Sequence, residues 1–151
     1  MKLLLASVLI TLSPTVVIAQ DVDIPAGRLT DEIILENPSV SLEEFLWIKR
    51  PIVVFADSPA DPRFIEQMAL INDRLHELES RDVVVLTDTD PSARSALRRQ
   101  LHPRGFMLAL VGKDGVVYLR RPLPWDVREI TRSIDKRPIR QQEIRESKGA
   151  S

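Results

Sequence analysis

Cysteine is absent from all 151 residues of this chain. This absence excludes disulfide bonds, catalysis by a thiolate, lipid attachment at a cysteine and thiolate coordination of a metal. A folded domain without cross-links must be held together by its hydrophobic core, and the chain is long enough to form one. Histidine is also scarce, because His76 and His102 are the only two. We expect His76 on a helix surface and His102 at a helix C-terminus.

A strong excess of charge of one sign is lacking too. The formal net charge is −1, and nothing predicts nucleic-acid binding, which usually accompanies a strongly basic domain or face. The charge is nevertheless unevenly spread, since residues 21–48 have a net charge of −6 and residues 120–148 a net charge of +4. One interpretation is that the two segments neutralise each other in the folded chain, and the other is a basic surface for an anionic partner.

Long apolar runs are lacking except at the N-terminus. Lys2 precedes an apolar stretch that ends at Leu12, and the small residues Val17 and Ala19 occupy the positions that a signal peptidase recognises. We therefore predict a signal peptide over residues 1–19, export to the periplasm or the extracellular space, and no transmembrane anchor after cleavage. The alternative is an uncleaved anchor, but a Ser-Pro pair interrupts the stretch, which is short of the span of about 20 residues that a bilayer requires.

The rest of the chain is organised around the stretch from Pro51 to Ile71. Its first part, Ile52–Ala56, is a continuous apolar run rich in β-branched residues, which is typical of a strand buried on both faces. Asp61 then provides a helix N-cap, and Pro62 suits the first helical position, where no N–H donor is needed. Apolar residues recur from there at spacings of three and four, which predicts one buried helix face formed by Phe64, Met68, Ile71, Leu75 and Leu78.

A similar alternation continues downstream. Asp82–Thr87 reads as a second buried strand, and it should run parallel to the first because a full helix connects them. Asp90-Pro91 repeats the cap and proline and predicts a second helix with Ala93, Leu97 and Leu101 inward. Two antiparallel strands, Gly105–Val111 and Val116–Leu119, follow and are joined by a hairpin turn at Asp114-Gly115. The last predicted helix is Trp125–Ile134. A short helix before the first strand begins with a capping box formed by Ser41 and Glu44.

This order of elements, βαβ, then α, then ββ, then α, is the core order of a thioredoxin-like fold. Four stretches carry a narrower resemblance: PIVVFADSPADPRFIEQ, DVVVLTDTD, GFMLALVGKDGVVYLRR and RPIRQQEIRE. They resemble a bacterial family of small exported thioredoxin-like domains of unknown function, called DUDES-type, with relatives inside secreted, matrix-associated animal proteins. The fold class predicted is α/β, with a central four-stranded mixed sheet and helices on both faces. The predicted organisation is a signal peptide (1–19), an N-terminal arm (20–40), the thioredoxin-like domain (41–146) and a C-terminal tail (147–151).

The resemblance to thioredoxin-like proteins also suggests where redox chemistry would be found. An active oxidoreductase of this fold carries two cysteines in the turn after the first strand and a cis-proline just before the third. Here the turn runs from Asp57 to Pro62 without a cysteine, and Met107 stands where the proline is expected. Serine cannot replace the thiolate in disulfide exchange. We therefore predict no thiol–disulfide oxidoreductase activity, no catalytic residue and no cofactor.

Acidic side chains follow the first two strands of the predicted sheet. Because parallel strands end at the same edge, Asp57, Asp61, Asp88 and Asp90 should lie along one edge, where open α/β sheets usually bind ligands. Carboxylate oxygens can hold a hard cation such as Ca²⁺ or Mg²⁺. The other interpretation is structural, since Asp61 and Asp90 serve as helix caps and Asp57 and Asp88 end strands. The sequence leaves both interpretations open and prefers the structural one.

The late basic segment is the second candidate surface. Arg128 and Arg132 are one helical turn apart and so share a face. The candidate face for an anionic partner consists of Arg128, Arg132, Arg137 and Arg140, preceded by Arg120 and Arg121. The alternative is a solvated face that pairs with the acidic N-terminal segment.

The function predicted from these patterns is a non-catalytic, exported binding module. Its expected partner is another envelope or extracellular protein, because the resemblance is to domains found in extracellular proteins and the redox cysteines are missing. The alternative is a small enzyme or a divalent-cation site at the acidic edge of the sheet.

Overall fold

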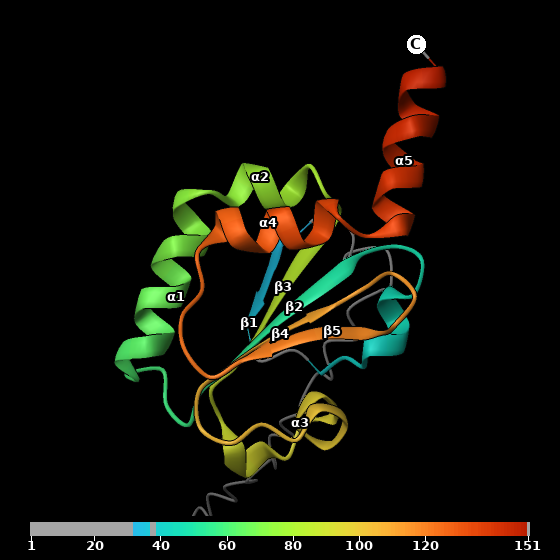
Figure 1. Ribbon diagram of the computed structural model, residues 1–151. Helices are drawn as coiled ribbons and strands as arrows, with labels where there is room; N and C mark the ends of the chain where they lie inside the picture. The colour runs from blue at the N-terminus through green and yellow to red at the C-terminus, as the bar shows by residue number, and fades with distance from the viewer. Residues whose placement is uncertain (1–31, 37–38, 151) are drawn as a thin grey trace, which may run out of the picture.

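The structure of the protein, a computed structural model, describes residues 32–36 and 39–150. The predicted signal peptide and most of the N-terminal arm lie outside the described residues. A mixed sheet with the strand order β1-β3-β2-β4-β5 forms the centre of the molecule (Figure 1). Its strands are β1 Ile34–Glu36, β2 Arg50–Phe55, β3 Val83–Asp88, β4 Met107–Val111 and β5 Val117–Arg121. The helices are α1 Pro62–Asp73, α2 Leu75–Glu79, α3 Ala96–Leu101, α4 Val127–Asp135 and α5 Pro138–Gly149, with 3₁₀ turns at η2 Leu42–Phe45 and η3 Pro91–Ala93.

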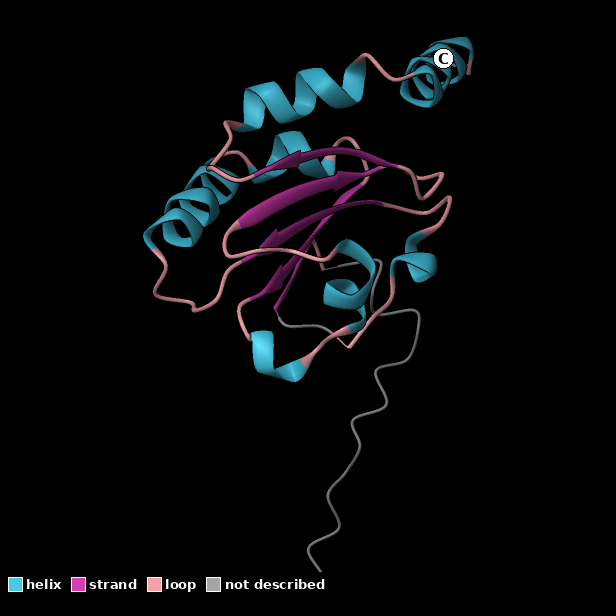
Figure 2. Cartoon of the chain, turned by 60° about the horizontal axis from the view of Figure 1, so that its bottom comes forward, coloured by secondary structure: helices cyan, strands magenta, loops and turns pink. Residues whose placement is uncertain are grey.

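The two central strands separate two hydrophobic cores. Every residue of β2 and β3 is buried, as the continuous apolar runs predict. Ile52 and Val54 point to the core under α1, α2 and α4, whereas Val53 and Phe55 point to the core beside α3 and η2, because successive side chains of a strand face opposite sides. Figure 2 shows helices above and below the strands. The α/β class and the thioredoxin-like arrangement with helices on both faces are thereby confirmed.

The pairing of the strands determines which chain segments meet at the sheet edge. β2 and β3 are parallel, with Phe55 opposite Asp88, so the turns after both strands lie at one edge. β4 runs antiparallel to β2 and places Met107 opposite Phe55. β5 is antiparallel to β4, and Gly115 with a positive φ of 78° lies in the hairpin turn between them, as the Asp-Gly signal predicts.

The prediction of four strands was wrong, because the sheet has five. The additional strand, β1, comes from the predicted N-terminal arm and pairs in parallel with β3, Ile34 lying opposite Val85. Its three residues are too few to show a period, so propensity alone does not reveal it. Pairing with a fully buried neighbouring strand, together with packing of Ile33 and Ile34 on the core, stabilises it.

The helix between β2 and β3 differs from the prediction in one respect. Its apolar face packs on the core as expected, and Asp61 caps α1 by accepting from the Arg63 N–H at 2.9 Å. The helix is not continuous, however, because the backbone leaves the helical region at Arg74 (φ −130°, ψ 32°) and α2 begins afterwards. The break lets Leu75 and Leu78 reach the same core after a change of direction.

Two later segments also differ from the predicted boundaries. Asp90-Pro91 opens only the 3₁₀ turn η3, and α3 begins after Ser95, whose Oγ accepts from the Arg98 N–H at 3.1 Å. The left-handed conformation of Arg94 separates the two elements. A further helix follows the one predicted as the last, because the segment from Pro138 forms α5 through Gly149. In Figure 1 the C-terminal part of α5 extends away from the sheet.

One buried side chain of α1 forms two hydrogen bonds with the loop between β5 and α4. Gln67 is fully buried, donates from Nε2 to the Trp125 carbonyl oxygen at 3.1 Å, and accepts at Oε1 from the Trp125 N–H at 2.7 Å. Gln67 therefore satisfies both backbone polar groups of the loop residue that precedes α4.

Replacing Gln67 by alanine should lower the free energy of unfolding by about 2 kcal/mol, because it leaves two partly buried backbone groups without a partner. Urea denaturation followed by circular dichroism measures this change. Gln142 in α5 is exposed, with its amide bonded only to Glu146, and Gln142→Ala is the matched control, with an expected change below about 0.5 kcal/mol. Equal effects of the two substitutions would contradict the proposal that Gln67 stabilises the loop before α4.

Candidate functional site

The turn after β2 occupies the place of the cysteine pair in redox-active proteins of this fold. One of its two acids, Asp61, accepts two side-chain hydrogen bonds from Arg63, one from Nε at 3.2 Å and one from Nη2 at 3.0 Å. The hydrogen bonds from Arg63 hold the pKa of the Asp61 carboxyl below its usual value. The Arg63 guanidinium also lies 5.7 Å from the ring centroid of Phe106. Both oxygens of Asp61 are therefore engaged within its own turn.

Asp88, at the end of β3, is the most buried of the candidate acids. It accepts from Arg98 Nε at 2.8 Å and from the Ser95 hydroxyl, and it is only 3% exposed. Arg98 also donates from Nη2 to the Ala56 carbonyl oxygen at 2.7 Å. This network ties α3 to the ends of β2 and β3.

The remaining two acids of this edge are exposed. Asp90 accepts from the backbone N–H of Ser92 at 3.0 Å and from its hydroxyl, and the hydroxyl hydrogen bond lowers the pKa of Asp90. Asp57 lies in the turn directly after β2. Within residues 32–36 and 39–150, no group of three or more acidic or histidine side chains is arranged to hold a metal ion. Asp61, Asp88 and Asp90 thus have the cap and network contacts of the structural interpretation, and a cation site here stays a prediction.

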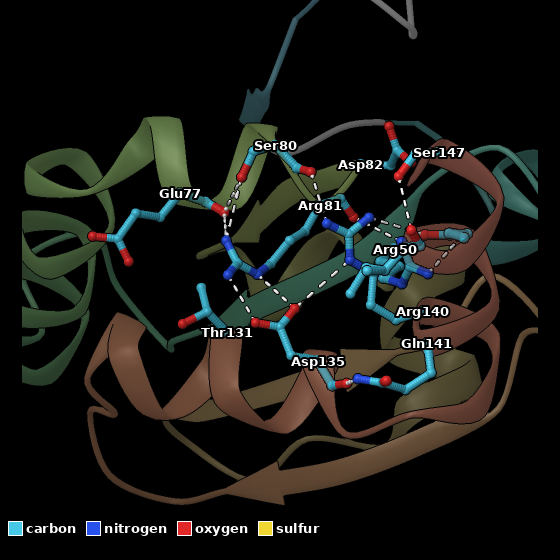
Figure 3. Close-up of polar contacts among 12 residues, drawn as sticks. Arg50, Glu77, Ser80, Arg81, Asp82, Thr131, Asp135, Arg140, Gln141 and Ser147 are labelled. Carbon is cyan, nitrogen blue, oxygen red and sulfur yellow. Dashed lines mark hydrogen bonds and ion pairs between the residues drawn. The ribbon is translucent and has the colours of Figure 1, made fainter. Parts of the chain in front are cut away.

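A second charged cluster lies where α5 meets the sheet (Figure 3). Arg50, the first residue of β2, is 4% exposed, and its guanidinium donates to Glu143 Oε1 at 2.7 Å and to the Arg81 carbonyl oxygen at 2.8 Å. Lys113 Nζ lies 3.0 Å from the same Glu143 oxygen and 2.8 Å from Asp82. One acid on α5 is therefore shared by two cations that belong to the body of the domain.

The cluster extends to the end of α4. Arg81 forms a bidentate pair with Asp135, its Nε and Nη2 lying 2.9 and 2.8 Å from the two carboxylate oxygens. Arg140 lies 3.7 Å from Asp135 and 3.2 Å from Glu143. Arg140, a member of the predicted anionic-partner face, is consequently turned into this cluster and is used to attach α5.

A basic groove lies on another side of α4. It has a volume of about 440 Å³ and is bounded by the end of β5, by α4 and by the first residues of α5. The groove residues with charged or aromatic side chains are Arg121, Trp125, Glu129, Arg132, Lys136 and Arg137. We refer to this set as the basic groove.

The contacts inside the basic groove leave most of its positive charge uncompensated. Its single acid, Glu129, pairs with Arg132 at 2.7 Å. Arg121 stacks over Trp125, 4.7 Å from the ring centroid, and Arg137 stacks over Tyr118 of β5 at 4.0 Å. Among the described residues, Arg121, Lys136 and Arg137 make no ion pair with an acid.

The four predicted arginines therefore do not share one surface. Arg132 and Arg137 lie in the basic groove, Arg128 lies with Arg132 in an adjacent depression between α4 and α5, and Arg140 belongs to the ion cluster. The candidate face omits Lys136, although it is four residues after Arg132 in the sequence and so on the same helix face. Trp125 packs on the core, and it also forms part of the groove wall.

The acidic N-terminal segment does not neutralise these arginines within the described chain. Glu43 contacts Gln100, and Glu44 accepts from the Ser41 N–H at 2.8 Å in the expected capping interaction. The ion pairs of the late basic segment are made with Glu129, Asp135 and Glu143 instead. Asp21, Asp23 and Asp31 lie outside the described residues.

No pattern in the sequence predicts one exposed apolar surface of the domain. Leu46, Trp47 and Ile48 follow η2 with 38%, 68% and 51% of their surface exposed. Trp47 has a left-handed backbone (φ 63°), held by its N–H bond to the Lys113 carbonyl oxygen at 2.8 Å. A positive φ is rare for a bulky residue, and the contact of Trp47 with the β4–β5 hairpin stabilises this backbone conformation.

Among residues 32–36 and 39–150, no helix combines the length and apolar character that crossing a bilayer requires.

Comparison with solved structures identifies the fold. The chain resembles the reduced 2-Cys peroxiredoxin of Plasmodium vivax with a TM-score of 0.52 and 16% identity, over 69% of this chain and 85% of that one. A Plasmodium yoelii Prx1a structure modified at its N-terminus follows with a TM-score of 0.49 and 18% identity, over 64% of this chain and 77% of that one. At 16% identity the likeness to the Plasmodium vivax structure concerns the fold alone, which is thioredoxin-like.

Comparison of sequences identifies the family. No curated protein sequence matches the chain. Residues 41–143, most of the domain described above, match the model of one family. The chain belongs to the family described as "Domain of unknown function (DUF4174)".

Proposed function

We propose that this protein is an exported, non-catalytic thioredoxin-like module that binds a negatively charged protein. The observation that carries the proposal is the basic groove, where Arg121, Lys136 and Arg137 have no acidic partner among the described residues. Cations that are not neutralised within a fold attract anionic groups and steer their approach. Acidic proteins provide such groups.

The absence of cysteine supports a function other than thiol chemistry. Peroxide reduction or disulfide exchange by a thioredoxin-like protein needs a cysteine thiolate, and this chain has none. The turn from Asp57 to Pro62 is instead closed by the pairing of Asp61 with Arg63. The scaffold is thus retained while the reactive group is missing, which favours a binding role.

Export is part of the proposal because of the N-terminal pattern of the sequence. The apolar stretch after Lys2 and the small residues before residue 20 support cleavage of a signal peptide. The resemblance of four sequence stretches to bacterial DUDES-type domains, whose relatives occur in extracellular animal proteins, favours a partner in the envelope or outside the cell. Cell fractionation and the measured mass of the processed protein test this part, and a cytoplasmic, uncleaved product contradicts it.

The competing function is a divalent-cation or small enzyme site at the acidic edge of the sheet. It needs Asp57, Asp61, Asp88 and Asp90 to direct oxygens toward one ion. The ion pair of Asp88 with Arg98 and that of Asp61 with Arg63 both weaken it, because a neighbouring guanidinium competes with a cation for the carboxylate.

Thermal unfolding of the purified protein separates the two functions. We expect heparin, used as a general polyanion probe, to raise the melting temperature, and Ca²⁺, Mg²⁺ and Zn²⁺ after chelator treatment to leave it unchanged. A ligand at a hundred times its dissociation constant stabilises by about 2.7 kcal/mol, which is easily detected. A rise with a divalent cation that Asp57→Asn removes would favour the metal site and contradict the proposal.

A further inference from the structure

The edge strand β5 and the basic groove lie side by side, and together they indicate how a partner is held. Resting on the proposed function, we infer that the partner supplies an extended acidic peptide that adds to the sheet as a sixth strand beside β5 and directs its carboxylates into the basic groove. Two independent features carry this inference, the position of β5 in the sheet and the charge beside it.

The first feature is the position of β5. In the described sheet β5 pairs only with β4 and ends the strand order. An edge strand leaves every second backbone N–H and C=O unpaired along its outer side, and an added strand can bond to them. The register of β5 with β4 shifts at Tyr118, since Leu119 lies opposite Leu110 and Val117 opposite Val111. The regular part of the edge, residues 119–121, can therefore pair with about three residues of an added peptide, at roughly 3.4 Å per residue.

The second feature is the arrangement of the cations beside this strand. Arg121 ends β5 and stacks over Trp125, while Arg137 reaches Tyr118 near the beginning of β5. The basic groove therefore has a cation near each end of the strand, and Lys136 and Arg132 from α4 line it as well. Aromatic rings hold the faces of the two stacked guanidinium groups, so the N–H groups at their edges remain available to carboxylates.

The geometry of a strand then defines the chemistry of the ligand. Alternate side chains of an added strand point to the same face, so a peptide with acids at every second position presents all its carboxylates to the α4 side. On the opposite face, Arg120 donates to the Leu101 carbonyl oxygen beside α3 and is already engaged. The preferred ligand is therefore an extended segment in which acidic and apolar residues alternate.

The experiment measures binding of a labelled, end-capped peptide, Glu-Val-Glu-Val-Glu-Val, to the purified protein by fluorescence anisotropy. We expect the double substitution Arg121→Glu with Lys136→Glu to raise the dissociation constant by about tenfold or more, which corresponds to 1.4 kcal/mol or more. The matched control is Arg145→Glu with Lys148→Glu, which reverses two exposed charges on α5 outside the groove and should change the dissociation constant less than about twofold.

Two N-methylated peptides test the strand pairing separately from the charge. Methylation of the three glutamate nitrogens and methylation of the three valine nitrogens block opposite edges of the peptide, because alternate N–H groups of a strand point the same way. We expect one methylated peptide to lose binding and the other to retain it. In spectra of the labelled protein, the unmodified peptide should shift the β5 amide signals and protect them from hydrogen exchange.

The possible failures are distinguishable. Equal binding of both methylated peptides, with heparin bound through the same groove residues, would overturn the strand addition and leave the proposed anionic partner intact. Equal binding by the groove variant and the wild-type protein, for the peptide and for heparin alike, would overturn the proposed function as well.

Discussion

Replacing Asp88 by alanine is expected to lower the free energy of unfolding by about 3–5 kcal/mol, the usual cost of removing one partner of a buried ion pair. The loss leaves Arg98, whose side chain is only 11% exposed, without its carboxylate at 2.8 Å. It also removes the acceptor of the Ser95 hydroxyl, whose oxygen caps α3. The expected consequence is a protein in which α3 detaches from the ends of β2 and β3 before the sheet unfolds.

Urea denaturation and hydrogen exchange of the α3 amides measure this effect. The matched control is Asp90→Ala, two residues further on, which removes only the cap of a 3₁₀ turn and should cost about 1 kcal/mol. Equal costs for the two substitutions would contradict the role assigned to Asp88. A double-mutant cycle with Arg98→Ala should give a coupling energy of about 1–3 kcal/mol, since the two side chains are in direct contact.

The second large effect is expected at the opposite end of β2. Arg50→Ala should lower the free energy of unfolding by about 3 kcal/mol at neutral pH, because it removes a buried cation from a shared ion cluster. Arg50 donates both to Glu143 on α5 and to the backbone of Arg81. The substitution should therefore release α5, which has no fully buried residue of its own, before it affects the sheet.

The same cluster predicts how stability depends on pH. Burial by itself would raise the pKa of Glu143, but hydrogen bonds from Arg50, Lys113 and Arg140 outweigh it and lower the pKa from 4.5 to about 2. Because the folded-state pKa lies below the unfolded-state value, the contribution of Glu143 is complete above pH 4.5 and is lost as the pH falls toward 2. We expect the loss to be about 2 kcal/mol, less than the full pKa shift implies, since part of the side chain remains in contact with solvent.

Denaturation curves recorded across this pH window test the assignment. Glu143→Gln should remove most of the stability change attributed to the carboxyl group, whereas Glu146→Gln, an exposed position on the same helix, should leave the pH profile as in the wild-type protein. An unchanged profile in Glu143→Gln would show that other acids cause the loss of stability.

These two networks explain how a domain without disulfides holds its peripheral helices. Asp88 with Arg98 attaches α3 at one end of the central strands, and Arg50 with Glu143 attaches α5 at the other. Asp88, a candidate for the predicted cation site, thereby forms an ion pair within the fold, and so does Arg140, a member of the predicted anionic-partner face. Arg121, Lys136 and Arg137 line one groove and make no ion pair among the described residues, which is why the proposed function is placed there.

Elements with local signals can be predicted from the amino-acid sequence alone. The β-branched runs at Ile52–Ala56 and Asp82–Thr87 predict the central strands, since their residues are buried on both faces. Asp61-Pro62 and Asp114-Gly115 predict a helix start and a hairpin from the backbone preferences of a few adjacent residues. The missing cysteines exclude thiol chemistry whatever the fold is.

Other features depend on contacts between residues that are distant in the sequence, and local patterns do not predict them. β1 forms because β3 offers it a partner, and Trp47 adopts its left-handed backbone because the hairpin carbonyl at Lys113 accepts its N–H. Arg140 and Arg137 are three residues apart, yet one enters the ion cluster and the other lies over Tyr118. Spacing along a helix indicates which side chains share a face, but the partner that each long side chain reaches depends on the packing of β5, α4 and α5 around it.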